Sequence, residues 1–294
     1  MSTLHGVYPI LPTPFKDNGA VDTESLERLI RYMRDQEVHG VAILGYLGEA
    51  HKLSTKERVQ VMRAVIDAKP PELQVYVGVR ALGAAGAVEQ GEAAAELGAD
   101  GLFVAPIAVQ NQGAQRDFFG AVAAQIALPI LIHDYPESFG VTLSVETIAG
   151  LANEHLNITG IKLEERPVLT KLSRLLERLP EFRVFGGLGG LYCLEELERG
   201  AAGIMTGFAF PGILVRIYAA IRAGDYDRAA AIYDRYATLI RYEFQPSIGL
   251  AFRKHIYKKR GIFESTHVRP PATELDAQSR NELERILERL ELNG

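Results

Sequence analysis

The sequence predicts an α/β protein: a (β/α)8 TIM barrel followed by a C-terminal helical extension. Three observations predict this fold. Short apolar runs alternate with amphipathic stretches along most of the chain. Several of these runs lack polar alternation, which is typical of parallel strands buried on both faces. After about residue 222 the apolar runs stop, and only helical patterns follow. At this length, closure of the parallel strands into a barrel is the expected outcome.

The predicted strands and helices can be placed by residue number. The expected strands are 7–11, 40–44, 75–79, 101–104, 130–133, 158–162, 183–185 and 203–206. The amphipathic stretches between them include 23–34, 55–68, 84–97, 115–125, 144–153 and 169–179. Ser54 followed by Glu57 has the spacing of a capping box. Gly98, Gly160 and Gly200 stand where helices lead into strands, so we expect a left-handed backbone at each of them.

The end of the chain forms a second region. Ranges 225–242, 248–260 and 273–291 are helical in pattern, with no predicted strand between them. We therefore expect a barrel at 1–222 and a helical extension at 223–294. An open doubly wound sheet is the alternative fold, but no G-x-G-x-x-G motif follows the first strand. The basic cluster that begins with Arg253 and Lys254 is expected to be a solvated helix face.

Composition and charge exclude several classes of function. The 294 residues carry a net charge of −5, which gives no electrostatic footprint for nucleic acid. No apolar run approaches the ~18 residues of a membrane span. The N-terminus does not look like a signal peptide. Cys193 is the single cysteine, so neither an internal disulfide nor a multi-cysteine metal site is expected. We expect a cytoplasmic protein with neither nucleic-acid nor membrane partners.

Lys162 is the first candidate catalytic residue, because it closes the sixth predicted strand. Chemistry in such barrels occurs at the C-terminal ends of the strands. Desolvation there lowers the pKa of a lysine, and a neutral lysine amine can attack a ketone to form an imine. The alternative is a lysine that reaches towards solvent and pairs with Glu164 or Glu165. Its position alone does not decide between the two.

His133 ends the fifth predicted strand and so lies beside Lys162 in the barrel. An unperturbed histidine pKa of ~6.5 suits proton transfer near neutral pH. A hydrogen-bonded core histidine without a catalytic role is the alternative. Asp134 is expected either to orient His133 or to bind substrate hydroxyl groups.

The loop after the second strand, Gly45-Tyr46-Leu47-Gly48-Glu49, is a candidate carboxylate site. Two glycines that bracket a turn expose successive backbone N–H groups, which suits an anion. Glu49 could instead be structural and tie the loop down.

Two further loops suggest substrate contacts at Gly187 and Thr206. The first loop is glycine-rich and spans 185–190, and Thr206 ends the eighth strand. Barrels often bind phosphate at these two loops, so a phosphosugar-binding enzyme is an alternative function. A bulky substrate that approaches the backbone closely is another. The glycines alone do not distinguish these alternatives.

Taken in order, several motifs resemble the dihydrodipicolinate synthase / N-acetylneuraminate lyase family. They are Thr13-Pro-Phe, Gly19-Ala-Val-Asp22, Gly45-x-x-Gly-Glu49, Leu53-Ser-Thr-x-Glu57-Arg, Glu96-Leu-Gly-Ala-Asp-Gly101, Pro136 with Gly140, and Gly160-Ile-Lys162. The resemblance covers nearly the whole chain. It implies a homotetrameric barrel with a helical extension. It also implies an imine between Lys162 and pyruvate or another 2-oxo acid, with no metal or organic cofactor.

The chain departs from the usual pattern of that family at several functional positions. His133 replaces the family's tyrosine, and Tyr46 and Leu47 replace its hydroxyl pair. The segment 106–108 replaces Pro-Tyr-Tyr, and Ser138 replaces an arginine that binds a second carboxylate. We therefore expect neither a dihydrodipicolinate synthase nor a sialic acid lyase.

The dehydratases of 2-keto-3-deoxy sugar acids are more similar, since they also lack that tyrosine. They are similar in carrying a Lys-x-Glu-x-x-Pro pattern, which here runs from Lys162 through Glu164 to Pro167. Side chains alternate along an extended chain, so Glu164 returns to the side of Lys162. The glycine-rich loop does not resemble that branch. Aldol cleavage and dehydration therefore both stay open.

The resulting hypothesis is a lyase that holds a small 2-oxo acid, of sugar-acid type, as an imine on Lys162. His133 and Glu164 are the candidate acid–base groups. The amides of Tyr46 and Leu47 are expected to hold the substrate carboxylate. A non-catalytic barrel that senses a 2-oxo acid is the alternative from a different class.

Overall fold

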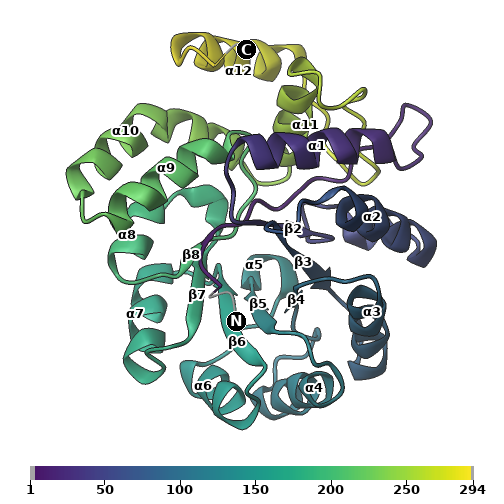
Figure 1. The fold of residues 1–294 in the computed structure, drawn as a ribbon, viewed down its shortest axis with the longest axis vertical. Helices are drawn as coiled ribbons and strands as arrows, with labels where there is room; N and C mark the ends of the chain where they lie inside the picture. Colours follow the sequence, from purple (N-terminus) through teal and green to yellow (C-terminus); the bar gives the residue numbers. More distant parts are fainter. Residues whose placement is uncertain (1–3, 293–294) are drawn as a thin grey trace.

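Eight parallel strands form the centre of the molecule, and helices surround them (Figure 1). The computed structural model describes residues 4–292. The strands are β1 (Gly6–Val7), β2 (Gly40–Ile43), β3 (Gln74–Val79), β4 (Gly101–Val104), β5 (Ile130–Asp134), β6 (Ile158–Leu163), β7 (Arg183–Gly186) and β8 (Gly203–Ile204). They pair in the order β1-β8-β7-β6-β5-β4-β3-β2. Leu11 N donates to Ala42 O at 2.8 Å and Ala42 N donates to Pro9 O at 2.9 Å, which joins the first strand region to β2. The predicted TIM barrel is confirmed.

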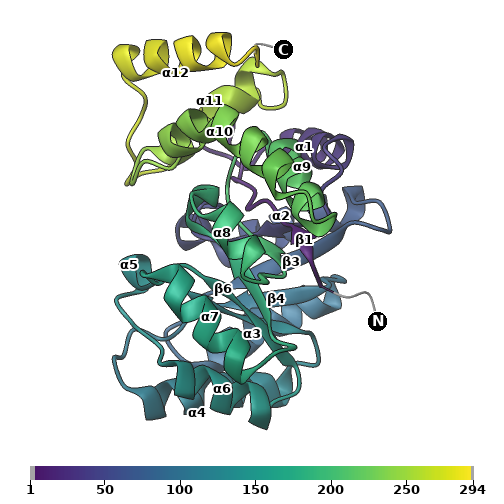
Figure 2. The ribbon, with the colours of Figure 1, turned by 90° about the vertical axis from the view of Figure 1, so that its left-hand side faces the viewer.

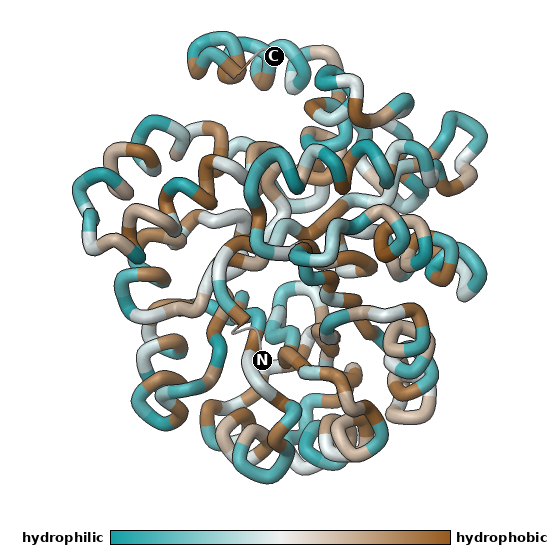
Figure 3. The backbone as a smooth tube through the Cα atoms, viewed as in Figure 1, coloured by the Kyte–Doolittle hydropathy of each residue, from teal (hydrophilic) through white to brown (hydrophobic). Residues whose placement is uncertain are grey.

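The helices follow the strands in alternation and lie outside them. They are α1 (Thr23–Asp35), α2 (Thr55–Ala68), α3 (Ala84–Glu96), α4 (Gln112–Gln125), α5 (Pro136–Phe139), α6 (Val145–Glu154), α7 (Val168–Arg178), α8 (Cys193–Glu198) and α9 (Pro211–Arg222), with short 3-10 turns η1 (Ala50–Lys52) and η2 (Leu188–Gly190). Ser54 and Glu57 form the predicted capping box at the start of α2. Hydrophilic and hydrophobic residues alternate along the outer helices (Figure 3), as expected for amphipathic helices that cover a core.

Apolar side chains fill two layers. The larger layer lies between strands and helices, and the smaller one fills the barrel interior with Tyr8, Tyr76, Phe103 and Phe185 among its members. The tyrosine rings require glycine on neighbouring strands. A Cβ at Gly40 would lie 2.3 Å from the ring of Tyr8, so the close approach of ring and backbone explains this glycine.

The C-terminal extension consists of α10 (Tyr226–Glu243), α11 (Gly249–Lys259) and α12 (Ala277–Arg289). Figures 1 and 2 show α11 and α12 stacked beyond one side of the barrel, with α12 farthest from the strands. The predicted helical extension is therefore confirmed. None of the described helices is both long and apolar enough to cross a bilayer.

The structure differs from the sequence prediction at two places. The first strand is shorter than 7–11, although Tyr8 N and Ile10 N still donate to the carbonyls of Ile204 and Thr206. Gly160 lies inside β6 rather than at a helix end. A Cβ there would lie 2.2 Å from the carbonyl oxygen of Arg183, so close strand packing explains this glycine. The left-handed backbone expected at Gly98 and Gly200 is confirmed.

Candidate active site

A cavity of about 570 Å³ opens at the carboxyl ends of the strands, between the barrel and the extension. Residues from the ends of β5, β6 and β8 and from the loop after β2 line one side of it. The connection between α10 and α11 lines the other side. The predicted site residues that line the cavity are Gly45, Tyr46, Leu47, His133, Lys162, Glu164 and Thr206. Asp134 and Gly187 lie outside this lining.

Lys162 lies in the barrel interior next to His133, its register partner on β5. Its Nζ lies 3.2 Å from His133 Nε2 and contacts the carboxylate of Glu164. Burial lowers the pKa of Lys162 to about 7, and the negative charge of Glu196 opposes this shift. A substantial fraction of the amine is therefore neutral at physiological pH, as imine formation requires.

Glu164 is held from both sides. Its Oε2 contacts Lys162 Nζ and lies 3.1 Å from His133 Nε2, while Oε1 accepts a hydrogen bond from Leu188 N at 3.2 Å. A Cβ at Gly187 would lie 2.3 Å from Glu164 Cγ. Gly187 therefore makes room for the glutamate, and the expectation that it contacts substrate is not supported. Lys162, His133 and Glu164 form one cluster, which is defined here as the lysine cluster.

His133 is enclosed by aromatic rings and by the lysine cluster. Ring centroids of Phe139 and Phe103 lie 4.9 and 5.4 Å from its own. Burial, followed by the positive charges of Lys162 and Arg80, lowers the pKa of His133 well below its usual value. The histidine is therefore neutral near pH 7. The sequence-based expectation used the unperturbed value, which does not apply to a desolvated ring.

The loop after β2 lines the cavity with Gly45, Tyr46 and Leu47, and several of its backbone amides are unpaired within the described part of the chain. Within residues 4–292, the backbone N–H groups of Tyr46, Leu47 and Gly48 donate no hydrogen bond. Leu44 and Glu49, at the two ends of the loop, have positive φ values of 57° and 54°. Successive unpaired amides in such a turn form a concave site for an anion.

Glu49 fixes this loop to the extension. Its Oε1 accepts from Lys254 Nζ at 2.6 Å, and its Oε2 accepts from Lys52 Nζ at 3.0 Å and Arg269 N at 3.0 Å. The structural interpretation of Glu49 is thus supported. Lys254 is 0% exposed and Arg253 is 2% exposed. The prediction that this basic cluster is a solvated face is therefore wrong for its first two residues.

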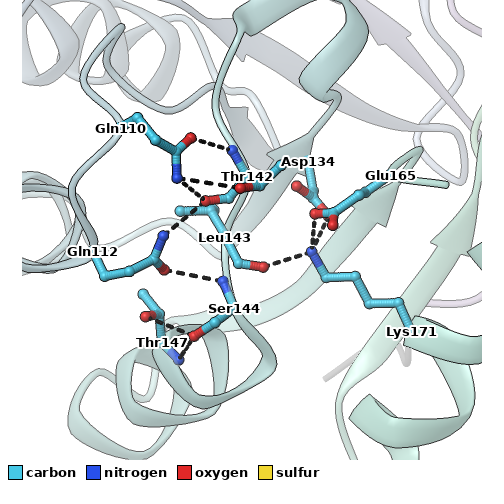
Figure 4. Close-up of polar contacts among 9 residues, drawn as sticks. All are labelled: Gln110, Gln112, Asp134, Thr142, Leu143, Ser144, Thr147, Glu165 and Lys171. Atoms are coloured by element: carbon cyan, nitrogen blue, oxygen red, sulfur yellow. Dashed lines mark hydrogen bonds and ion pairs between the residues drawn. The ribbon is translucent and has the colours of Figure 1, made fainter. Parts of the chain in front are cut away.

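Asp134 does not line the cavity, and its carboxylate points toward Lys171 (Figure 4). Its Oδ2 accepts from Lys171 Nζ at 2.6 Å, and the same ammonium also binds Glu165 Oε2 at 2.6 Å and the carbonyl of Leu143 at 2.7 Å. Asp134 neither orients His133 nor lines the cavity, contrary to both expectations. The reason is the strand alternation, because His133 faces inward and its neighbour must face outward. Asp134 instead ties β5 to α7 and to the loop after β6.

The glycine-rich loop after β7 uses its amides within the protein. Leu188 N donates to Glu164, Gly189 N to Thr206 Oγ1 at 2.8 Å, and Gly190 N to the carbonyl of Gly187 at 2.9 Å. A Cβ at Gly189 would lie 2.4 Å from Phe244. The loop therefore accommodates protein side chains, and its amides do not form a phosphate site as the phosphosugar alternative requires.

Sequence reasoning missed the part of the cavity that the extension supplies. Arg253 of α11 and Phe244, at the end of α10, line the cavity together with Tyr135 after β5. The apolar neighbours of Arg253 were a usable signal, since Phe252 and Ile256 mark a buried helix face. Among the described residues, no group of three or more His, Cys, Asp and Glu side chains is arranged to hold a metal ion.

The family assignment follows from this geometry and from a sequence match. The model of the dihydrodipicolinate synthetase family matches residues 3–290. The chain belongs to this family. It is accordingly a lyase of the aldolase or dehydratase type, and the members of its family act on small molecules.

Relatives with different names share this scaffold. The L-2-keto-3-deoxyarabonate dehydratase of Azospirillum brasilense is 30% identical, over 97% of this chain and 94% of its own length. The 4-hydroxy-tetrahydrodipicolinate synthase of Methanosphaerula palustris is 31% identical, over 96% and 98%.

Solved structures agree with the same fold. The crystal structure of dihydrodipicolinate synthase from Rhodopseudomonas palustris has a TM-score of 0.93 and 33% identity, with 98% of both chains covered. A prophage protein of this family from E. coli K12, solved in complex with pyruvate, has a TM-score of 0.91 and 26% identity, covering 99% of this chain and 100% of its own.

Proposed function

We propose that this protein dehydrates a 2-keto-3-deoxy sugar acid through an imine on Lys162. The observation that carries the proposal is the lysine cluster, in which a buried amine contacts a carboxylate that is fixed by a backbone amide. A neutral amine and an adjacent base are the two groups that imine catalysis at a ketone needs.

The first step is attack of Lys162 Nζ on the C2 carbonyl carbon. A C–N bond forms, the carbonyl oxygen leaves as water, and the resulting imine withdraws electrons from C3. The free amides of Tyr46 and Leu47 support a second part of the proposal, that they bind the C1 carboxylate during this step. A related protein of the family was crystallised with pyruvate, which is compatible with such a carboxylate site.

Glu164 is the proposed proton carrier. Its carboxylate contacts the nitrogen to which C2 becomes bound, so C3 lies one bond farther along. Glu164 removes a proton from C3, the electron pair moves into an enamine, and the C4 hydroxyl then leaves with a proton as water. With L-2-keto-3-deoxyarabonate this leaves a C3=C4 double bond beside the C5 hydroxyl group, and proton shifts from C5 and its hydroxyl to C3 and C4 convert this part of the molecule into a C5 aldehyde. Hydrolysis of the imine then releases the semialdehyde and returns the Lys162 amine. His133, neutral and enclosed, holds the other two members of the cluster in place.

Dehydration is favoured over aldol cleavage by two observations. Glu164 contacts the nitrogen to which C2 would be bound, which supports a role at C3, whereas cleavage of the C3–C4 bond requires a base at the more distant C4 hydroxyl. The relative from Azospirillum brasilense is a dehydratase by name. In addition, Ser138 offers no positive charge where synthases of the family bind a second carboxylate, so we expect no synthase activity.

Product analysis tests this proposal. With L-2-keto-3-deoxyarabonate, we expect loss of water and a 2-oxo acid semialdehyde, at about 1–10³ turnovers per second. Release of pyruvate and glycolaldehyde in equal amounts would show aldol cleavage instead. Adduct formation without any product, across a panel of 2-keto-3-deoxy acids, would indicate a sensor rather than an enzyme.

A further inference from the structure

Every lysine and arginine in the cavity lining is already paired with a carboxylate. The four pairs are Lys52 with Glu49 at 3.0 Å, Lys162 with Glu164, Arg166 with Glu137 at 3.2 Å, and Arg253 with Glu243 at 3.2 Å. An anion placed in an enclosed site is stabilised only if a cation or several donors compensate it. A second carboxylate on the substrate would find no uncompensated cation in this lining.

Arg253 is the only one of these cations that comes from the extension, within the described chain. Its Nη2 donates to the carbonyl of Glu243 at 3.3 Å, and its Nε faces Glu243 Oε2. Its Nη1 makes no hydrogen bond with any described residue. The guanidinium lies against Gly207, where a Cβ would be 3.3 Å from Cζ, and a Cβ at Gly249 would be 3.6 Å from Nη1. Arg253 lines the cavity together with both glycines.

Glu243 sets the charge of this group. It is buried at the end of α10, outside the cavity lining, and its Oε2 accepts from Ala209 N at 3.1 Å. Burial raises the pKa of Glu243 to about 7, and the charge of Arg253 opposes that shift. Above pH 7, where the Glu243 carboxylate is ionised, the pair offers the cavity hydrogen-bond donors with little net charge, which suits a hydroxyl group better than a carboxylate.

We propose that Arg253 is a specificity-determining residue that donates a hydrogen bond from Nη1 to a distal hydroxyl group of the bound 2-oxo acid. The site then selects substrates with one carboxylate and a neutral hydroxylated tail. This inference rests on the proposed function, because it takes the imine on Lys162 as the fixed end of the substrate.

Three 2-oxo acids that differ only in the group at the far end of the molecule serve as probes of this contact. Pyruvate has no tail, 5-hydroxy-2-oxopentanoate has a terminal hydroxyl, and 2-oxoglutarate has a terminal carboxylate on a chain of equal length. For each probe, the concentration that gives half of the maximal borohydride-trapped adduct on Lys162 is measured by mass spectrometry. At about pH 8, where Glu243 is ionised, we expect the hydroxyl probe to half-saturate the wild-type protein at about tenfold lower concentration than 2-oxoglutarate.

Substitutions in the Arg253–Glu243 pair should remove this preference. Arg253→Met should raise the half-saturating concentration of the hydroxyl probe about tenfold relative to that of pyruvate. Glu243→Gln should leave the charge of Arg253 uncompensated and improve 2-oxoglutarate binding about tenfold relative to the hydroxyl probe. Because Arg253→Met leaves a buried glutamate unpaired, the double variant Glu243→Gln/Arg253→Met provides the same test in a neutral site.

Arg166→Met is the matched control, since it removes a half-exposed arginine from the rim of the same cavity. Because solvent screens its charge, this substitution should change the ratio of the half-saturating concentrations of the hydroxyl probe and 2-oxoglutarate by less than about twofold. If the hydroxyl probe and 2-oxoglutarate half-saturate the wild-type protein at the same concentration while pyruvate forms a normal adduct, the proposed role of Arg253 is wrong but the imine on Lys162 is not. The role of Arg253 is also contradicted if Arg253→Met raises the half-saturating concentration of pyruvate as much as that of the hydroxyl probe. Arg253 would then bind the C1 carboxylate. The absence of any adduct overturns the imine and this inference together.

Discussion

Single residues in this cavity owe their chemistry to burial. Lys162 has a pKa of about 7 because the barrel interior disfavours its charged form, whereas an exposed lysine titrates near ~10.4. The same desolvation keeps His133 neutral and leaves Glu164 as the one ionisable partner fixed by an amide. Their positions at or just after the ends of predicted strands place these three residues in the cavity. The protonation of His133 could not be predicted in the same way, because the aromatic rings that bury it come from other parts of the chain.

The rate of imine formation should follow the titration of Lys162. Below pH 7 the rate with pyruvate should fall about tenfold per pH unit, because only the neutral amine attacks the carbonyl. Above about pH 7.5 it should level off. Single-turnover borohydride trapping between pH 5.5 and 10 measures this profile. A rate that keeps rising to pH 10 would show a lysine with an ordinary pKa and contradict the desolvation argument.

Two substitutions distinguish the proton carrier within the lysine cluster. Glu164→Gln should lower kcat for dehydration by about 10²–10⁴ while the imine can still be trapped. His133→Asn should cost about tenfold or less, because the neutral histidine positions the cluster rather than carrying the proton. Steady-state rates with L-2-keto-3-deoxyarabonate provide the comparison. A fully active Glu164→Gln protein beside an inactive His133→Asn protein would assign the proton transfer to the histidine.

At the scale of elements, the loop after β7 shows how glycines serve packing. A Cβ at Gly186 would overlap the carboxyl group of Glu196, and one at Gly187 would overlap the side chain of Glu164. A Cβ at Gly189 would overlap the ring of Phe244. The sequence showed the glycines but not what approaches them, because their neighbours come from other parts of the chain. The phosphosugar alternative arose from this ambiguity.

Gly189→Ala should destabilise the protein more than a strained backbone alone explains. The residue has φ 69°, and a Cβ would overlap Phe244, so we expect a loss of about 2–4 kcal/mol. Gly224→Ala is the matched control, since it has φ 76° with no atom within 4 Å, and about 1 kcal/mol should be lost there. Urea unfolding measures both free energies. Equal losses would mean that Phe244 moves aside at no cost.

The extension illustrates what local patterns cannot predict. Its helices were placed within a few residues, because their periodicity is local. The burial of Lys254 depends on Glu49, which lies 205 residues earlier in the sequence. Arg253 likewise reaches the cavity because the connection between α10 and α11 and the first half of α11 line it. Arg253, which the sequence pattern assigns to a charged surface, is therefore buried and lines the cavity.

For the whole molecule, strand and helix alternation was sufficient to predict the barrel, since each parallel strand repeats the same buried pattern. The alternation of side chains along a strand predicts that Lys162 and Glu164 lie on the same side of β6. The same rule predicts that Asp134, the neighbour of His133, faces away from the barrel interior. The division at residue 222 and the homotetramer stay predictions. Contacts such as Glu243 with Ala209 join the extension to the barrel, so the site needs both regions.

The central claim is the imine on Lys162, and reductive trapping tests it most directly. The protein is incubated with pyruvate and sodium borohydride, digested, and mapped by mass spectrometry. We predict one reduced pyruvyl adduct per chain, on Lys162, with no adduct in Lys162→Ala, whose fold should persist because Glu164 keeps its contacts with His133 Nε2 and Leu188 N. An adduct on a different lysine, or none with any 2-oxo acid, would contradict the account.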